Sequence, residues 1–173
     1  HDALPIYGSH RLMLFHQPFI NQVAAHFPHT DILLGKPMPV NAAGNFYRQF
    51  EEGDFEPSSQ LRWLLDTPAR ASEYAQLAQD LNQRMLACIE IDVGLHRGGV
   101  RNDAELIALL NVIQASPQLE FAGFMGYEPH VVKVPGDPVW YRDAAMSRYT
   151  HYIARAKDHL GDDWPADPVL NCG

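Results

Sequence analysis

The sequence predicts an α/β protein whose architecture is a partial TIM (β/α)8 barrel, with about six parallel strands and helices between them. Two observations lead to this class. Most strand candidates are apolar on both faces, as is typical of parallel strands that are covered on both sides. They also alternate with amphipathic helical stretches along the whole chain, which is the pattern of successive βα units. An open doubly wound sheet is the alternative that the same pattern allows.

The strand candidates are short apolar runs that end in glycine or polar residues. In chain order they are residues 11–16, 31–35, 61–67, 84–94, 119–128 and 168–172. A complete barrel of this class has eight strands and roughly 250 residues. We therefore expect about two βα units to lie outside the printed sequence.

Five stretches have helical spacing, namely residues 18–27, 39–50, 66–82, 102–114 and 140–160. Two of them carry start signals. Thr67 is suited to cap the third stretch, and Pro68 suits a first helical position. Asn102 and Glu105 have the spacing of a capping box.

Composition excludes several classes of protein. The 173 residues are 46% hydrophobic and 20% charged, and the net charge is −8, from 13 Lys+Arg against 21 Asp+Glu. Phosphate backbones require clustered cations, so nucleic acid is not an expected partner. The chain also lacks an apolar run of the roughly 18 residues that a membrane span needs. Cys88 and Cys172 form neither a disulfide framework nor a Cys-x-x-Cys motif. We expect a cytoplasmic protein.

The first six residues, "HDALPI", match one reading frame of a common sequencing-adapter oligonucleotide, CAC GAC GCT CTT CCG ATC T. The final T also begins a tyrosine codon, and Tyr7 follows. We therefore interpret residues 1–6 as a read-through artefact and residues 7–173 as the partial barrel domain. The last residues stop within a predicted strand and its turn, so both ends look cut.

The carboxyl ends of barrel strands carry the active site in this class of fold. Here these ends hold His16, Gly35–Lys36, Asp66–Thr67, Asp92–Arg97, Gly126–His130 and Asn171–Gly173. Arg97 supplies a permanent cation with planar donors, and Tyr127 supplies a flat face and a hydroxyl. The backbone N–H groups of residues 171–173 suit a phosphate. Together they suggest a site for a planar, phosphorylated ligand.

Three motifs carry a resemblance to a known family: "EIDVGLHRGGV", "FAGFMGYEPH" and the terminal "LNCG". They resemble the alanine-racemase-like barrel of fold type III pyridoxal-phosphate (PLP) enzymes, nearest to the D-threonine aldolase and D-serine dehydratase branch. The resemblance covers about residues 8–173. The first motif is fairly specific, the second is less so, and the third is weak when taken alone.

The resemblance implies cofactor-binding roles for five residues. Arg97 would contact the phenolic oxygen of pyridoxal 5'-phosphate, and Tyr127 would lie beside its pyridine ring. Asn171, Cys172 and Gly173 would hold the phosphate. These roles define the expected cofactor site.

Other residues near this site have alternative readings. His96 and His130 are expected to line the substrate pocket. Glu90 and Asp92 share one strand face, so they suit either a carboxylate pair for metal or acid–base chemistry or, as we favour, the polar lining of the barrel. Arg97 has two alternatives, a solvated loop arginine and an ion-pair partner of Asp92. We predict no metal ligand among these residues.

The family's Schiff-base lysine lies at the end of the first barrel strand, upstream of the residues present here. The catalytic residue is therefore unknown, and Lys36 receives no such role from the resemblance. The D-threonine aldolase branch holds a divalent metal (zinc or manganese) in a C-terminal β-domain, which is also missing. We expect the chain by itself to be inactive.

The predicted function is that of a fragment of a PLP-dependent lyase of D-amino acid metabolism. It resembles D-threonine aldolase, which implies retro-aldol cleavage or dehydration of a D-β-hydroxy amino acid. The intact enzyme is expected to form homodimers. An amino-acid racemase of the same fold and a non-enzymatic PLP-binding barrel protein are the alternatives.

Overall fold

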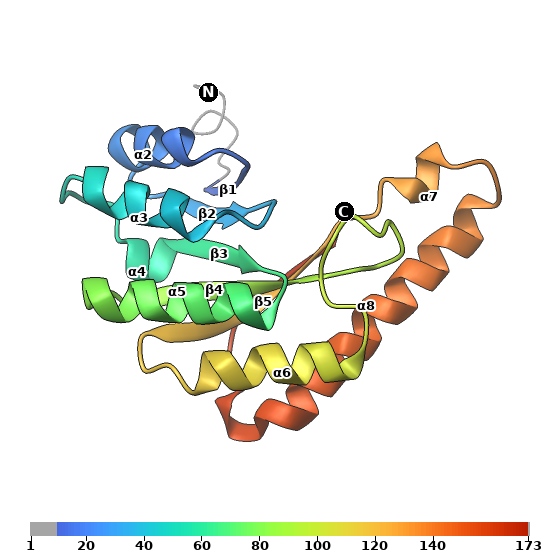
Figure 1. Cartoon of the computed structure of the whole chain (residues 1–173). Helices are drawn as coiled ribbons and strands as arrows, with labels where there is room; N and C mark the ends of the chain where they lie inside the picture. Colours follow the sequence, from blue (N-terminus) through green and yellow to red (C-terminus); the bar gives the residue numbers. More distant parts are fainter. Residues whose placement is uncertain (1–9, 173) are drawn as a thin grey trace.

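A computed structural model describes residues 10–172, so the proposed artefact at residues 1–6 and the predicted phosphate contact Gly173 lie outside the described residues (Figure 1). One sheet contains six strands in the order β1-β2-β3-β4-β5-β6. They are β1 (Arg11–Leu14), β2 (Asp31–Leu34), β3 (Leu61–Leu65), β4 (Met85–Ile91), β5 (Leu119–Gly126) and β6 (Val169–Cys172). Every neighbouring pair is parallel. The predicted fold class is confirmed.

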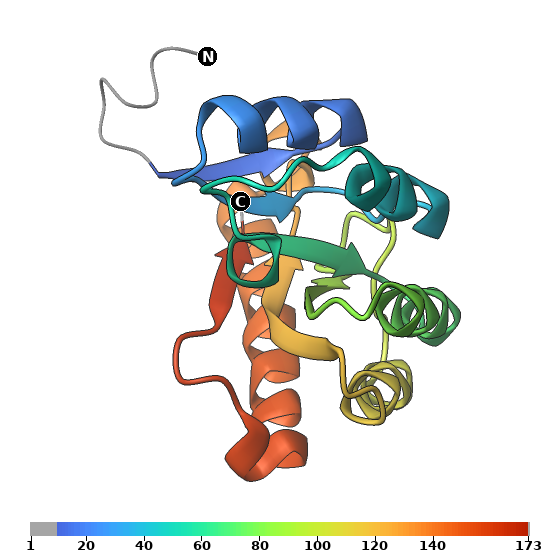
Figure 2. The same cartoon turned by 90° about the vertical axis from the view of Figure 1, so that its left-hand side faces the viewer.

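Five long helices occupy the predicted stretches: α2 (Gln17–His26), α3 (Val40–Gln49), α5 (Pro68–Leu81), α6 (Asp103–Gln114) and α8 (Pro138–Leu160). Three short turns of helix were not predicted: α4 (Pro57–Gln60), α7 (His130–Lys133) and η1 (Gly161–Asp163). Figure 2 shows the long helices in an arc around one face of the sheet. A doubly wound sheet would reverse its strand order and carry helices on both faces, so that alternative is wrong.

The sheet curves as a barrel wall does. Strands β1 and β6 each pair with a single neighbour, yet residues from both line one cavity of about 430 Å³. Leu12 and Met13 contribute from β1, and Val169 and Leu170 contribute from β6. Since the two sheet edges face a common space, the six strands form part of a barrel. Among residues 10–172, no helix is both long and apolar enough to cross a bilayer.

The core lies between the sheet and its arc of helices. All seven residues of β4 are buried, as expected of a central strand with neighbours on both sides. Phe46 and Tyr74 both pack against Trp63, with ring centroids 6.0 and 5.7 Å from it, and none of the three side chains has exposed surface. The Tyr74 hydroxyl donates to the Met38 carbonyl at 3.1 Å. Each such side chain contributes roughly 1.5–3 kcal/mol of hydrophobic stabilisation.

The helix starts follow the predicted capping chemistry with two differences. Thr67 accepts from the Arg70 N–H at 3.2 Å, and Asn102 accepts from the Glu105 N–H at 2.9 Å. Glu105 bonds the N–H of Arg101, one residue before the cap, rather than that of Asn102. Helix α8 begins two residues earlier than predicted because Asp137 caps it and Pro138 takes the first helical position.

Gly123 sets how closely β5 and β6 can pair. Its φ is +141°, and a Cβ there would lie 2.0 Å from the Val169 carbonyl oxygen. We expect Gly123→Ala to lower the free energy of unfolding of the full-length protein by about 2–4 kcal/mol, since it adds backbone strain and a collision with backbone. The urea midpoint measures this change.

Gly53→Ala is the control for this prediction. Gly53 is exposed, and a Cβ there would meet no atom within 4 Å. We expect its effect to stay within about 0.5 kcal/mol. Equal midpoints for the two variants would contradict the close β5–β6 approach.

Candidate functional site

The turn after β4 folds back onto the strand that precedes it. The Val100 N–H donates to the Glu90 carbonyl at 2.9 Å, and the Asp92 N–H donates to the Val100 carbonyl at 3.1 Å. Gly99 has a φ of +91°, and a Cβ there would lie 2.7 Å from the Glu90 carbonyl oxygen. Glycine is therefore required where the turn closes against the strand. The result is a compact loop that presents consecutive side chains at the end of β4.

Asp92 organises this turn. Its Oδ1 accepts from the N–H groups of Gly94 and His96 at 3.0 and 2.9 Å, and its Oδ2 accepts from His96 Nδ1 at 2.8 Å. Burial raises the pKa of Asp92, but the hydrogen bonds from His96 and from the two N–H groups outweigh burial and lower it. The Asp92 side chain is 3% exposed and also lies 3.5 Å from the Arg101 guanidinium. Asp92 is thus an ionised anchor for the turn.

Arg97 pairs with Glu90, and the alternative of a pair with Asp92 is wrong. Its Nε and Nη2 donate to Glu90 Oε1 at 3.0 and 2.5 Å, and Nη2 also donates to the Gly35 carbonyl at 3.1 Å. Burial raises the pKa of Glu90, and the hydrogen bond and charge of Arg97 oppose that rise. Among the described residues, Nη1 of Arg97 has no hydrogen-bond partner. It is the part of the guanidinium available to a ligand.

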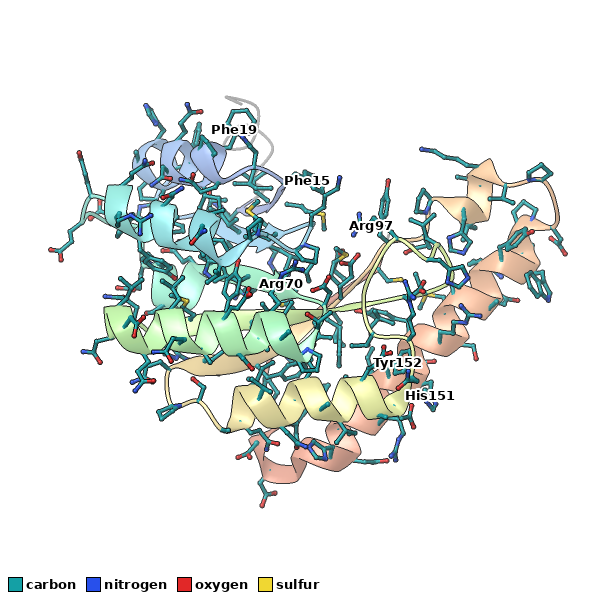
Figure 3. The ribbon with its side chains drawn as sticks, viewed as in Figure 1. Phe15, Phe19, Arg70, Arg97, His151 and Tyr152 are labelled. Carbon is teal, nitrogen blue, oxygen red and sulfur yellow. The ribbon has the colours of Figure 1, made fainter. Side chains whose placement is uncertain are left out.

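Four strand ends meet around Arg97. Its guanidinium lies over the Tyr127 ring, 4.6 Å from the centroid, just after β5. Gly35 follows β2, and a Cβ there would lie 2.2 Å from a ring carbon of Phe15, which follows β1. Figure 3 shows Phe15 and Arg97 on the same side of the sheet. Phe15 and Tyr127 are 55% and 37% exposed, so flat apolar surface borders the cation.

The end of β6 contributes two side chains. Asn171 Oδ1 is buried and has no hydrogen-bond partner among the described residues. Cys172 Sγ donates to Glu128 Oε2 at 3.1 Å. Burial, with the nearby Glu128 carboxylate, raises the pKa of Cys172 to about 12. Cys172 therefore stays a neutral thiol at physiological pH. The Asn171 Oδ1 is an acceptor that lacks a donor among the described residues.

The two histidines expected in the substrate pocket lie in different surroundings. His130 is 8% exposed, stands edge-on to Tyr141, and has an Nδ1 without a partner in the described part of the chain. The His96 side chain is 69% exposed and lines a surface pocket with Arg101 and residues of α8. No hydrogen bond or ring contact between described residues joins either histidine to Arg97 or Tyr127.

Sequence reasoning missed Glu90 as the partner of Arg97, and it missed the Gly35 carbonyl. One signal was available, because Glu90 lies between apolar residues of a buried strand and a buried carboxylate needs a cation. Nothing in the sequence indicates which backbone carbonyl would accept from Arg97. Within residues 10–172, no three His, Cys, Asp or Glu side chains are placed to hold a metal ion.

The fold and the site define a class: a parallel α/β barrel wall with a fixed arginine and flat side chains at the carboxyl ends of its strands. The sequence model of the alanine racemase N-terminal domain matches residues 41–166, more than half of the chain. The chain therefore belongs to this family, which is the barrel of fold type III PLP enzymes. The comparison with curated proteins found no match.

Solved structures agree with the fold. Alanine racemase from Clostridium difficile 630 has a TM-score of 0.76 at 12% identity, over 99% of this chain and 43% of that one. D-threo-3-hydroxyaspartate dehydratase from Delftia sp. HT23 has a TM-score of 0.69 at 15% identity, over 99% and 50%. The C353A mutant of a D-threo-3-hydroxyaspartate dehydratase, in a metal-free form, reaches 0.74 at 18% identity, over 99% and 44%. The chain thus spans half or less of each.

The ionised state of Asp92 predicts a pH-dependent effect of its loss. The pKa of Asp92 is lowered from its ordinary value of 3.8 in the folded protein. The carboxylate therefore stabilises the fold fully at pH values above 3.8, and this stabilisation is lost as the pH falls through the lowered pKa. We expect Asp92→Asn to lower the free energy of unfolding by about 1–3 kcal/mol at pH 7.

Urea unfolding at several pH values measures the difference between Asp92→Asn and the parent. The difference should narrow as pH falls below 3.8. The exposed Asp162 provides a control, and Asp162→Asn should change stability by no more than about 0.5 kcal/mol. A difference for Asp92→Asn that is the same at all pH values would mean that its charge does not stabilise the turn.

Proposed function

We propose that this chain binds pyridoxal 5'-phosphate at the carboxyl ends of its strands and forms the cofactor-binding part of an enzyme that acts on an amino acid. The observation that supports this most is Arg97. Its guanidinium is held by Glu90 and by the Gly35 carbonyl and lies over the Tyr127 ring, and no described residue bonds its Nη1. A cation fixed in this way suits an anionic oxygen on a flat ligand.

The residues present fit such a cofactor. Arg97 would bind the phenolic oxygen through Nη1. Tyr127 would border the pyridine ring with the part of its surface that Arg97 leaves open. Asn171, Cys172 and Gly173 would receive the phosphate. Phosphate oxygens accept hydrogen bonds, so Asn171 would contribute its NH2 group to this contact and not its buried Oδ1.

The chain's own residues would prepare this site in two ways. Glu90 fixes the orientation of Arg97 and balances its charge, so that a bound oxygen meets an already oriented donor. Cys172 keeps its proton, so its thiol does not compete for the aldehyde of the cofactor. The bound cofactor would supply an electron sink for a bond broken at the amino acid.

We further propose a lyase acting on a D-β-hydroxy amino acid, by retro-aldol cleavage or dehydration, with a divalent metal held outside this chain. The motif resemblance to the D-threonine aldolase branch supports this choice, and so does the fold shared with a D-threo-3-hydroxyaspartate dehydratase. His96 and His130 are proposed to line the substrate pocket, and the intact enzyme is proposed to be a cytoplasmic homodimer.

Two alternatives keep the same site. An amino-acid racemase is favoured by the fold shared with alanine racemase, and it would need a second acid–base residue on the opposite cofactor face. A non-enzymatic PLP-binding barrel protein would use the same cofactor contacts without turnover.

Arg97→Ala tests the cofactor site. We expect the variant of the full-length protein to lose at least about tenfold in affinity for pyridoxal 5'-phosphate, since it removes a charge-assisted hydrogen bond. Arg97→Lys should lose nearly as much, because a lysine cannot bond Glu90 and the ligand with a planar group. Titration with the cofactor, followed by its absorbance, gives both affinities.

Arg84→Ala is the matched control, since the Arg84 side chain is about half exposed and pairs with Glu120. Its cofactor affinity should equal that of the parent. If Arg97→Ala kept the cofactor affinity and the turnover of the parent, Arg97 would not be a cofactor contact.

The class of reaction is tested with the full-length protein, saturated with pyridoxal 5'-phosphate. A lyase would release a carbonyl product from D-threonine or D-threo-3-hydroxyaspartate, and a chelator would abolish this release. Interconversion of D- and L-alanine without carbonyl product would establish the racemase instead. Cofactor binding with neither reaction would favour the non-enzymatic protein.

A further inference from the structure

A second polar pocket lies on the other side of the turn that carries Arg97. It has a volume of about 410 Å³ and opens between this turn and helix α8. Its lining includes Asp92, His96 and Arg101 from the turn, and Ser147, Arg148 and His151 from α8. We call this set the arginine pocket. In Figure 3, Arg97 lies beside the carboxyl ends of the strands, whereas His151 lies lower, beside the first turn of α6.

The single carboxylate in the arginine pocket is already fully bonded. Asp92 accepts from two backbone N–H groups and from His96, and it lies 3.5 Å from Arg101. With only 3% of its side chain exposed, Asp92 presents little negative surface to the pocket. Two arginines against one aspartate leave a net positive charge, although the whole chain carries −8.

Arg148 is the arginine of this pocket whose guanidinium is most available to a ligand. It forms no ion pair or hydrogen bond with another described residue. Its position is nevertheless defined, because Nη1 lies 3.3 Å from the point where a Cβ would stand on Gly94. The guanidinium therefore packs over the backbone of the turn, with its remaining N–H groups available to a ligand.

The two carboxylates next to the pocket, Asp103 and Glu105, bond groups other than Arg148, and Glu105 accepts from the backbone N–H of Arg101 at 2.8 Å. Asp103, at the start of α6, accepts from His151 at 2.7 Å and from Arg155 at 2.9 Å. Its carboxylate is thus paired on its own side of the pocket. His96 donates from Nδ1 to Asp92, so a protonated ring carries a second N–H at Nε2. Ser147 adds a hydroxyl donor.

Such a set of donors suits an anion rather than a metal ion. Arginine offers only N–H donors, and these match the oxygens of phosphate in a planar fork. Among the described residues, the two histidines and the aspartate of the pocket do not form a metal-binding group. We infer that the arginine pocket binds a small oxyanion of the phosphate class, held mainly by Arg148 and Arg101.

This site does not depend on the proposed cofactor site. Its donors come from α8 and from the turn. Arg97 and Tyr127 are not among its lining residues, and His96 is the one lining residue that is also proposed for the substrate pocket. Both inorganic phosphate and the phosphate group of a phosphomonoester carry the required chemistry. The two sources are separate arms of the test.

The test uses the full-length protein after saturation with pyridoxal 5'-phosphate, so that any phosphate site of the cofactor is filled. Inorganic phosphate, a simple phosphomonoester and chloride at equal ionic strength are titrated while the ring resonances of His96 and His151 are followed. We expect phosphate to shift both rings with a Kd of about 1 mM or below, and chloride to leave them unchanged. A tighter Kd for the phosphomonoester would identify the ester as the better ligand, and an equal or weaker one would identify the free ion.

Arg148→Ala should weaken phosphate binding by about tenfold or more, because it removes a charge-assisted contact. Arg142→Ala is the matched control, since Arg142 lies earlier on α8 and pairs with Asp143 outside the pocket. It should bind phosphate as the parent does, and so should Arg97→Ala.

Equal responses to phosphate and chloride, or equal losses in the Arg148 and Arg142 variants, would overturn the site. A loss in Arg97→Ala but not in Arg148→Ala would assign the phosphate to the cofactor site and would also overturn it. If the protein binds no pyridoxal 5'-phosphate, the phosphate titration still decides the arginine pocket. The two proposals therefore fail separately.

Discussion

The carboxylate of Asp92 is the constraint on which the site depends. By accepting from the N–H groups of Gly94 and His96, it holds the turn after β4 in one conformation. His96 adopts a left-handed backbone with φ of +59° there, and the ring itself is bonded to the same carboxylate. The next residue, Arg97, then reaches Glu90 on the other side. The buried Asp92 carboxylate thus directs the adjacent residues His96 and Arg97 into two different polar regions.

Glu90 and Asp92 show how two carboxylates on one strand face acquire different properties. Asp92 is met by backbone N–H groups and by His96, so its pKa falls. Glu90 is buried with Arg97 as its cation, and burial outweighs that pairing, so its pKa rises. Spacing along a strand places two groups on one face, but burial and the hydrogen-bond donors around each group decide the direction in which its pKa shifts.

Several elements could be predicted because their causes are local. The caps Thr67 and Asn102 bond N–H groups three residues ahead, so both partners appear in one short stretch of sequence. Helix α7 was not predicted because its four residues offer too few positions for a helical period. The convergence of Arg97 with Tyr127 was only partly predictable, since strand ends indicate a common edge of the sheet but not which side chains touch.

Six parallel strands, the helices between them and the family motifs at the strand ends can all be predicted from sequence. Hydrophobic period, glycine positions and capping residues act over a few residues, so the chain displays them directly. Only the tertiary structure decided that Arg97 bonds Glu90 rather than Asp92, that the Gly35 carbonyl joins them, and that Arg148 faces the turn. Gly35 and Arg97 are 62 residues apart, and such contacts exist only after parallel strands have aligned their carboxyl ends.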